Sequence, residues 1–214
     1  INNGVMSTLN SPNEVHLAEY LVSIHPWSNM ARFARSGGEA NAIALRLARA
    51  FTDSEKVAYC GYHGWHDWYL ASNIGKKNSL FKYKGVPKSL KNTAFSFKYN
   101  SFKEAKNLII KKKIKIIFME VVRNEMPKNN FLKKIRKLAD DTGSVLIFDE
   151  CTSGFRECLG GIYKKFKVVP DLLIYGKSIG NGYPINVVVG KDKVMKSEKS
   201  TFISSTFWSD RIGP

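Results

Sequence analysis

Short apolar runs and longer amphipathic segments alternate along most of this chain. Four runs are nearly unbroken, which is typical of strands buried on both faces of a parallel sheet; they cover residues 56–60, 114–119, 144–148 and 171–175. Three further segments carry apolar residues at helical spacing; they cover residues 41–51, 102–112 and 131–141. The alternation from Phe33 to Ile174 therefore predicts an α/β fold with a mainly parallel sheet and helices on both faces.

Two polar residues stand just after the last two apolar runs. Asp149 follows Phe148 directly, and Lys177 follows Tyr175 by one glycine. Ligands of open α/β sheets bind at the carboxyl ends of the strands, so we expect both side chains at one edge of the sheet. A lysine there can form an imine, and a carboxylate can keep a pyridinium nitrogen protonated, which is the pair that a pyridoxal phosphate enzyme needs. Alone, the pair is equally compatible with a surface ion pair beside a glycine-rich turn.

A short glycine-rich segment joins the strand expected at 30–35 to the helix expected at 41–51. It contains Ser36, Gly37 and Gly38. Free N–H groups and the positive end of the dipole make a helix start an anion site, and glycines let the backbone approach a ligand closely. The segment therefore predicts a phosphate cradle, with a plain glycine turn as the alternative.

Aromatic and histidine side chains gather after the strand expected at 56–60. Tyr62 and two tryptophans there are suited to packing on a flat ring. His63 and His66 have a spacing that a metal site can use, but no third ligand motif accompanies them. We therefore expect no metal, and ordinary local packing of both histidines remains an alternative.

The composition narrows the class of protein. The chain has 214 residues and a net charge of +16, which raises nucleic acid as a partner. Lysines cluster at 111–113 and 133–134 on expected outer helix faces, so a solvated surface is favoured. Three cysteines without ligand spacing favour a reducing cytoplasm. We expect no membrane span and no signal segment, and the structured sequence at both ends predicts part of a longer protein.

Five motifs together resemble the class III aminotransferases of fold type I, the pyridoxal phosphate group that includes glutamate-1-semialdehyde aminomutase. They lie in order at residues 36–40, 61–64, 148–156, 176–184 and 205–207. The resemblance implies a three-layer α/β/α domain, the large cofactor-binding domain of that fold type. Residues 1–214 would form part of this domain, without the family's N-terminal segment and C-terminal small domain.

The resemblance also implies roles for individual residues. The implied cofactor site consists of Ser36, Gly37, Gly38, Tyr62, His63, Glu120, Asp149, Cys151, Lys177 and Thr206. Lys177 would form the internal aldimine with pyridoxal 5′-phosphate, Asp149 would pair with the pyridinium nitrogen, and Tyr62 would stack on the ring. Thr206 would reach the phosphate of the other subunit in a homodimer. The reaction would join an amino donor to a keto or aldehyde acceptor.

Three positions depart from the family pattern. Gly38 replaces the usual threonine, Cys151 replaces an apolar branched residue, and Val121 follows Glu120 in place of a proline. Gly38 and the tryptophan-rich stretch at 65–68 favour an ordinary aminotransferase over the aminomutase. A nucleotide- or nucleic-acid-binding module that uses the glycine segment and the basic surface is the alternative from another class.

Overall fold

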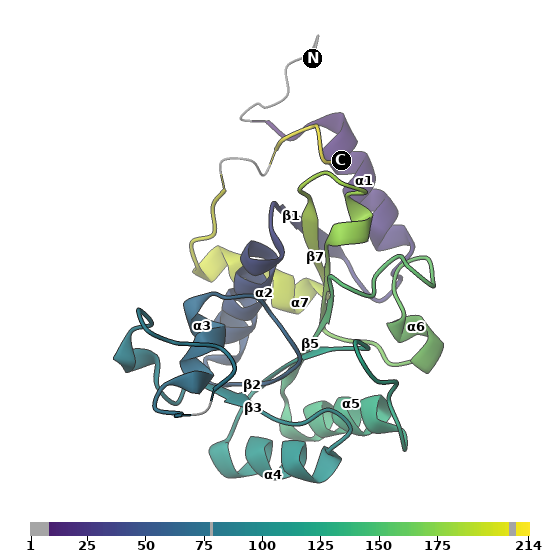
Figure 1. Ribbon diagram of the computed structural model, residues 1–214. Coiled ribbons are helices and arrows are strands. Elements are labelled where there is room, and N and C mark those ends of the chain that lie inside the picture. The colour runs from purple at the N-terminus through teal and green to yellow at the C-terminus, as the bar shows by residue number, and fades with distance from the viewer. Residues whose placement is uncertain (1–8, 78, 206–208) are drawn as a thin grey trace.

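The computed structural model describes residues 9–77, 79–205 and 209–214 and arranges them around one seven-stranded sheet (Figure 1). The strand order is β1-β7-β6-β5-β4-β2-β3. The strands are β1 (Met30–Ala34), β2 (Val57–Cys60), β3 (Ala94–Ser96), β4 (Ile116–Glu120), β5 (Val145–Glu150), β6 (Leu172–Tyr175) and β7 (Asn186–Gly190).

Five neighbouring strands, β6 to β3 in that order, are parallel. The prediction of a mainly parallel sheet is thereby confirmed. β7 runs antiparallel to both β1 and β6, however, and the sequence pattern identified neither β7 nor the short edge strand β3. β3 lies in the polar stretch 71–100, where three residues give almost no alternation to recognise.

Helices cover both faces of the sheet, as the alternation predicted. They are α1 (Pro12–Ser23), α2 (Gly37–Thr52), α3 (Asp67–Leu70), α4 (Phe102–Lys112), α5 (Phe131–Thr142), α6 (Tyr163–Phe166) and α7 (Asp192–Met195). Figure 1 shows α4 and α5 on one side of the sheet and α2 and α7 on the other. In the described part of the chain, no helix has both the length and the apolar character needed to cross a membrane.

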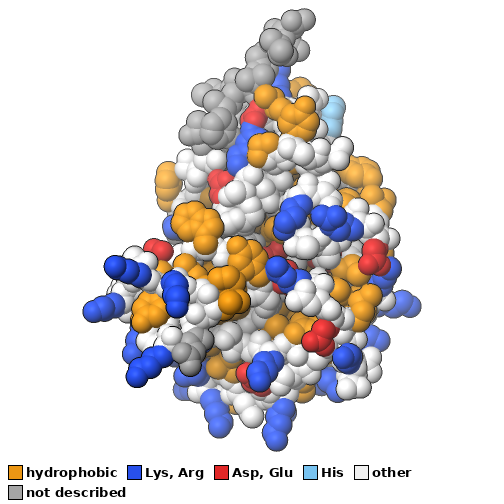
Figure 2. All heavy atoms as spheres, viewed as in Figure 1, with side chains coloured by type: hydrophobic (Ala, Val, Ile, Leu, Met, Phe, Trp, Pro, Cys, Tyr) orange, Lys and Arg blue, Asp and Glu red, His pale blue; other side chains and the backbone are white. Residues whose placement is uncertain are grey.

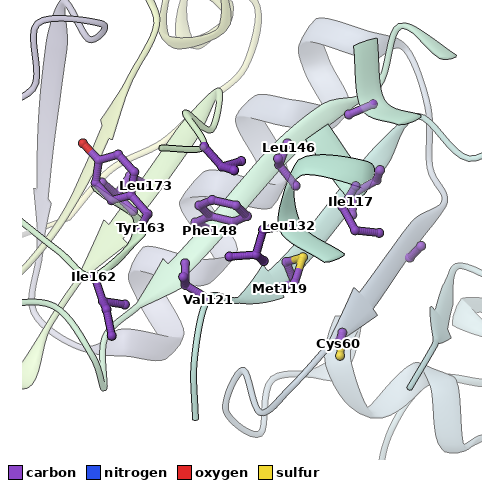
Figure 3. Packing of buried hydrophobic residues seen from close by; sticks show 14 of the residues in the cluster. Cys60, Ile117, Met119, Val121, Leu132, Leu146, Phe148, Ile162, Tyr163 and Leu173 are labelled. Atoms are coloured by element: carbon purple, nitrogen blue, oxygen red, sulfur yellow. The ribbon is translucent and has the colours of Figure 1, made fainter. Parts of the chain in front are cut away.

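Alternate residues of the central strands enter two separate cores. On β5, Val145 and Ile147 pack in the core that contains α2, whereas Leu146 and Phe148 pack in the core that contains α5. Figure 3 shows Leu146 and Phe148 beside Leu132 of α5 in this second core. Because side chains of a strand alternate between faces, Asp149 falls on the α2 side and the next residue on the α5 side.

The start of α2 differs from the expected one. The sequence pattern placed the helix at 41–51, after a glycine turn, but Gly37 and Gly38 already form its first turn. Ser36 is the N-cap, and its Oγ accepts the N–H of Glu39 at 3.2 Å. This capping hydrogen bond offsets the poor helix propensity of the two glycines.

Candidate active site

Asp149 and Lys177 lie at the carboxyl ends of neighbouring parallel strands. In the register of β5 and β6, Asp149 pairs with Ile174. Lys177 follows two residues after the end of β6, at the start of a short 3₁₀ turn. The strands therefore deliver a carboxylate and an amine to one edge of the sheet, in the arrangement that the apolar runs predicted.

The carboxylate of Asp149 is buried and accepts three hydrogen bonds. His63 Nδ1 lies 2.8 Å and Asn41 Nδ2 lies 3.2 Å from Oδ2, and the N–H of Cys151 donates to Oδ1 at 3.0 Å. Burial by itself raises the pKa of this carboxyl, but the hydrogen bond and charge of His63 and the N–H of Cys151 outweigh it and hold the pKa below its ordinary value. Asp149 is thus kept ionised.

His63 lies under Asp149 and is almost completely buried. Its Nδ1 faces the carboxylate, and its Nε2 faces the carbonyl oxygen of Cys60 at 3.2 Å. Each ring nitrogen therefore faces an oxygen acceptor. The ring packs against Phe118 with centroids 4.5 Å apart. His63 therefore supports the carboxylate from inside the fold.

Lys177 is held in an unusual backbone conformation, with a φ of 47° in the left-handed region. Its side chain is exposed, and its Nζ donates a hydrogen bond to Thr152 Oγ1 at 3.0 Å. The preceding residue must be glycine, because a Cβ on Gly176 would lie 2.1 Å from Asn186 Oδ1. Backbone strain of this kind clusters at functional sites, where it orients a side chain that acts.

The N-terminus of α2 opens near the same edge and has unused donors. Within the described residues, the N–H groups of Gly37 and Gly38 form no hydrogen bond. A Cβ on Gly38 would lie 2.7 Å from His66 Nε2, so the imidazole of His66 fills the space of a larger side chain at 38. Two free amides at a helix N-terminus bind anions.

Tyr62 stands at the end of β2, half exposed. Its N–H donates to Glu120 Oε2 at 2.8 Å, so the buried Glu120 fixes the loop that carries the ring. Arg123 is 3.3 Å from the Glu120 carboxylate, and its guanidinium lies 5.2 Å from the centre of the Tyr62 ring. The Glu120 carboxylate therefore holds this loop by a hydrogen bond, although Val121 follows it in place of the proline that is usual in the family.

Cys151 is buried between the two glycine segments. Its Sγ would lie 3.6 Å from a Cβ on Gly37 and 3.2 Å from one on Gly176. Burial, followed by the charge of Asp149, raises the pKa of the thiol, so it stays protonated. It is a packing residue of the site. Thr206 lies outside the described residues.

Sequence reasoning missed two buried amides at the site. Asn41 joins Asp149 to the loop after β2, since Nδ2 also donates to the carbonyl of His63 at 3.1 Å. Its Oδ1 is buried and has no hydrogen-bond partner among the residues that the structure describes. Asn186 donates to the carbonyl of Arg35 at 2.9 Å and ties β7 to the start of α2. A signal existed in each case: an amide interrupts an Ala- and Leu-rich helix face or a Val-rich strand.

In chemical terms, this edge combines an ionised carboxylate, a primary amine, free amide donors and an aromatic ring. The set suits a flat, anionic heterocycle with a carbonyl group. Among the described residues, no three His, Cys, Asp or Glu side chains lie together in a way that could hold a metal ion.

Comparison with known proteins gives one consistent relationship. The family model for class III aminotransferases matches residues 4–212. A 3-aminobutyryl-CoA aminotransferase of Cloacimonas acidaminovorans is 35% identical, with 99% of this chain and 51% of the relative covered. A glutamate-1-semialdehyde 2,1-aminomutase of Sulfolobus acidocaldarius is 39% identical, with 91% of this chain and 48% of the relative covered. The chain thus spans about half the length of the curated relatives it matches.

Solved structures agree in fold. An omega-transaminase of Sphaerobacter thermophilus superposes with a TM-score of 0.88 at 26% identity and covers 99% of this chain and 53% of that one. The internal aldimine form, with pyridoxal phosphate, of the FumI protein of Sphingopyxis sp. MTA144 superposes with a TM-score of 0.87 at 25% identity, covering 99% and 51%.

Proposed function

The chain belongs to the class III aminotransferases, a family dependent on pyridoxal phosphate, and on that premise we propose that it carries the cofactor-binding half of an enzyme that moves an amino group. The observation that supports this most strongly is the pairing of Asp149 and Lys177. One is a buried carboxylate kept ionised, and the other is an amine held at φ 47° at the end of the neighbouring strand. A surface ion pair needs neither burial nor strain.

The residues of the site fit pyridoxal phosphate. The free N–H groups of Gly37 and Gly38 supply donors for the phosphate, and Ser36 sets their direction by capping α2. Asp149 supplies an acceptor for the ring nitrogen, and Tyr62 supplies a half-exposed ring for stacking. When bound, the cofactor acts as an electron sink for the carbon that loses a proton.

The reaction then depends on two groups of this chain. Asp149, held by His63, Asn41 and the N–H of Cys151, keeps a proton on the ring nitrogen. Lys177 would hold the cofactor covalently through Nζ, and as a free amine its Nζ would accept the proton that the amino-bearing carbon of the substrate loses. Thr152 Oγ1, 3.0 Å from Nζ, orients the amine.

Intramolecular amine migration, as in glutamate-1-semialdehyde aminomutase, is the second candidate. Relatives with that name are up to 39% identical to this chain, against 35% for the aminotransferase. Gly38 and the tryptophan-rich stretch at 65–68 depart from the aminomutase pattern, which favours transfer between two substrates. The two candidates use the same cofactor residues, so only substrate turnover separates them.

Absorbance spectra of the full-length protein test the proposal. With pyridoxal phosphate and an amino donor alone, we expect the pyridoxamine form to accumulate and a keto product to leave. A 2-oxo acid should then restore the original spectrum. Conversion of glutamate-1-semialdehyde to 5-aminolevulinate without a donor would select the aminomutase, and a colourless protein that binds DNA would select the nucleic-acid-binding module.

Three earlier expectations stay proposals. We propose a homodimer in which Thr206 reaches the partner's cofactor phosphate, a cytoplasmic location, and a whole protein in which a further N-terminal segment and a C-terminal small domain complete the active site. Sedimentation of the full-length protein tests the dimer. A monomer that is fully active would refute both the dimer and the role of Thr206.

A further inference from the structure

The segment between α3 and β3 has a one-sided charge. Residues 71–93 contain six lysines and no aspartate or glutamate. A protein surface ordinarily mixes charges of both signs, because like charges repel. Figure 2 shows blue side chains projecting around the lobe at the left that carries α3.

Five of these lysines surround a cavity of about 500 Å³. They are Lys76, Lys77, Lys82, Lys84 and Lys88. All five are exposed, and within the described residues none forms an ion pair. A hollow lined by one sign of charge concentrates ligands of the opposite sign.

Aromatic side chains complete the lining. Phe81 and Tyr83 alternate with Lys82 and Lys84 along the wall of the cavity. Hydrogen bonds from Asn73 Nδ2 at 3.2 Å and Ser79 Oγ at 2.9 Å hold the carbonyl of Phe81. Ammonium groups bind phosphate oxygens and aromatic rings stack on nucleobases, so this lining suits a nucleotide better than a simple anion.

The cavity also adjoins the candidate active site. The Phe81 ring contacts Tyr62, the residue expected to stack on the cofactor, with centroids 5.8 Å apart, and Tyr69 at 6.2 Å. A ligand in the cavity is therefore separated from the cofactor residues by one layer of side chains.

From these observations we propose that the cavity binds the nucleoside diphosphate part of the substrate whose amino or carbonyl group reacts at Lys177. The lysines hold the diphosphate, and Phe81 and Tyr83 pack against the base. The proposal rests on the proposed function for the reacting end. It names the class of substrate, which the cofactor residues leave open.

Calorimetric titration of the full-length protein with ADP tests the proposal. We expect binding to the native protein, weaker binding of inorganic pyrophosphate because stacking is lost, and a decrease in ADP affinity of about tenfold or more in the double variant Lys82→Gln, Lys84→Gln. The matched control is Lys106→Gln, Lys111→Gln on α4, which removes the same charge from exposed lysines elsewhere. Its affinity should stay within about twofold of native.

Two results would overturn the proposal: no ADP binding to the native protein, or equal weakening in both double variants, which would indicate general surface charge. An ADP affinity equal to that of pyrophosphate would refute the nucleoside part. Cofactor attachment, measured by absorbance on the same samples, distinguishes failure of this inference from failure of the proposed function. Attachment without ADP binding refutes this inference alone, whereas no attachment to the native protein refutes the proposed function.

Discussion

Replacing His63 with phenylalanine removes the hydrogen bond that does most to keep Asp149 ionised. The two rings are similar in shape, and His63 already lies among aromatic rings, with Phe118 at 4.5 Å and Trp68 at 6.2 Å. Packing should therefore survive. The carboxylate, which is 4% exposed, keeps only the donors of Asn41 and Cys151.

The expected loss follows from this geometry. A hydrogen bond to a charged group contributes about 1.5–3 kcal/mol, and a buried charge that loses its partner costs about 3–5 kcal/mol. Because two donors remain, we expect His63→Phe to lower the free energy of unfolding by about 2–3 kcal/mol at pH 6.

The loss should depend on pH. In the native protein the pKa of Asp149 lies below its unfolded value, so stability from this group is present above that value, about 3.9, and is lost as the pH falls further. Without His63, burial should raise the pKa of Asp149 in the folded protein above its unfolded value of about 3.9. The stability of the variant should then fall as the pH rises from the unfolded pKa to the folded one. The gap between native and variant should therefore widen from pH 4 to pH 6.

Urea unfolding followed by tryptophan fluorescence across pH 4 to 6 measures the gap. The matched background is Asp149→Asn, which has no charge to lose, so His63→Phe should cost less than about 1 kcal/mol there. A cost that is equal in both backgrounds and independent of pH would refute the reasoning and reduce His63 to a packing residue.

Three further predictions follow from single contacts. Asp149→Asn should keep cofactor binding but lose most turnover, because an amide does not hold the ring nitrogen protonated; near-normal turnover in steady-state assays would contradict this. Gly176→Ala should cost about 1–3 kcal/mol of unfolding free energy, because its Cβ would lie 2.1 Å from Asn186 Oδ1, whereas Gly37→Ala, with 3.6 Å to its nearest neighbour, should not destabilise the fold. Burial, followed by the charge of Lys164, lowers the pKa of His25 to about 4, so the free energy of unfolding should fall by about 1.4 kcal/mol per pH unit as the pH drops from about 6.5 toward 4. Urea unfolding of a His25→Gln variant should lack this pH dependence, and an unchanged dependence would contradict the prediction.

The sequence pattern predicted those parts of the site that depend on local order. The apolar runs before Asp149 and Lys177 located both residues at strand ends, and the parallel register of β5 and β6 brought them to one edge. A strand that is buried on both faces consists almost entirely of apolar residues, so such runs can be recognised in the sequence alone.

What escaped prediction depends on packing between distant segments. Asn41 and Asp149 are separated by 108 positions, and their contact is set by how α2 lies on the sheet. The ring of His66 over Gly38 likewise depends on the path of the loop after β2. The apolar run of β7 is compatible with either strand direction, so its antiparallel pairing was not predictable from composition.

The site of covalent attachment tests the central claim most directly. The full-length protein is incubated with pyridoxal phosphate, reduced with borohydride, digested and mapped by mass spectrometry. We predict one pyridoxyl adduct on the peptide that contains Lys177, and none on that peptide in a Lys177→Ala variant whose unfolding is otherwise unchanged. A native protein without an adduct, or with the adduct on any other lysine, would contradict the account.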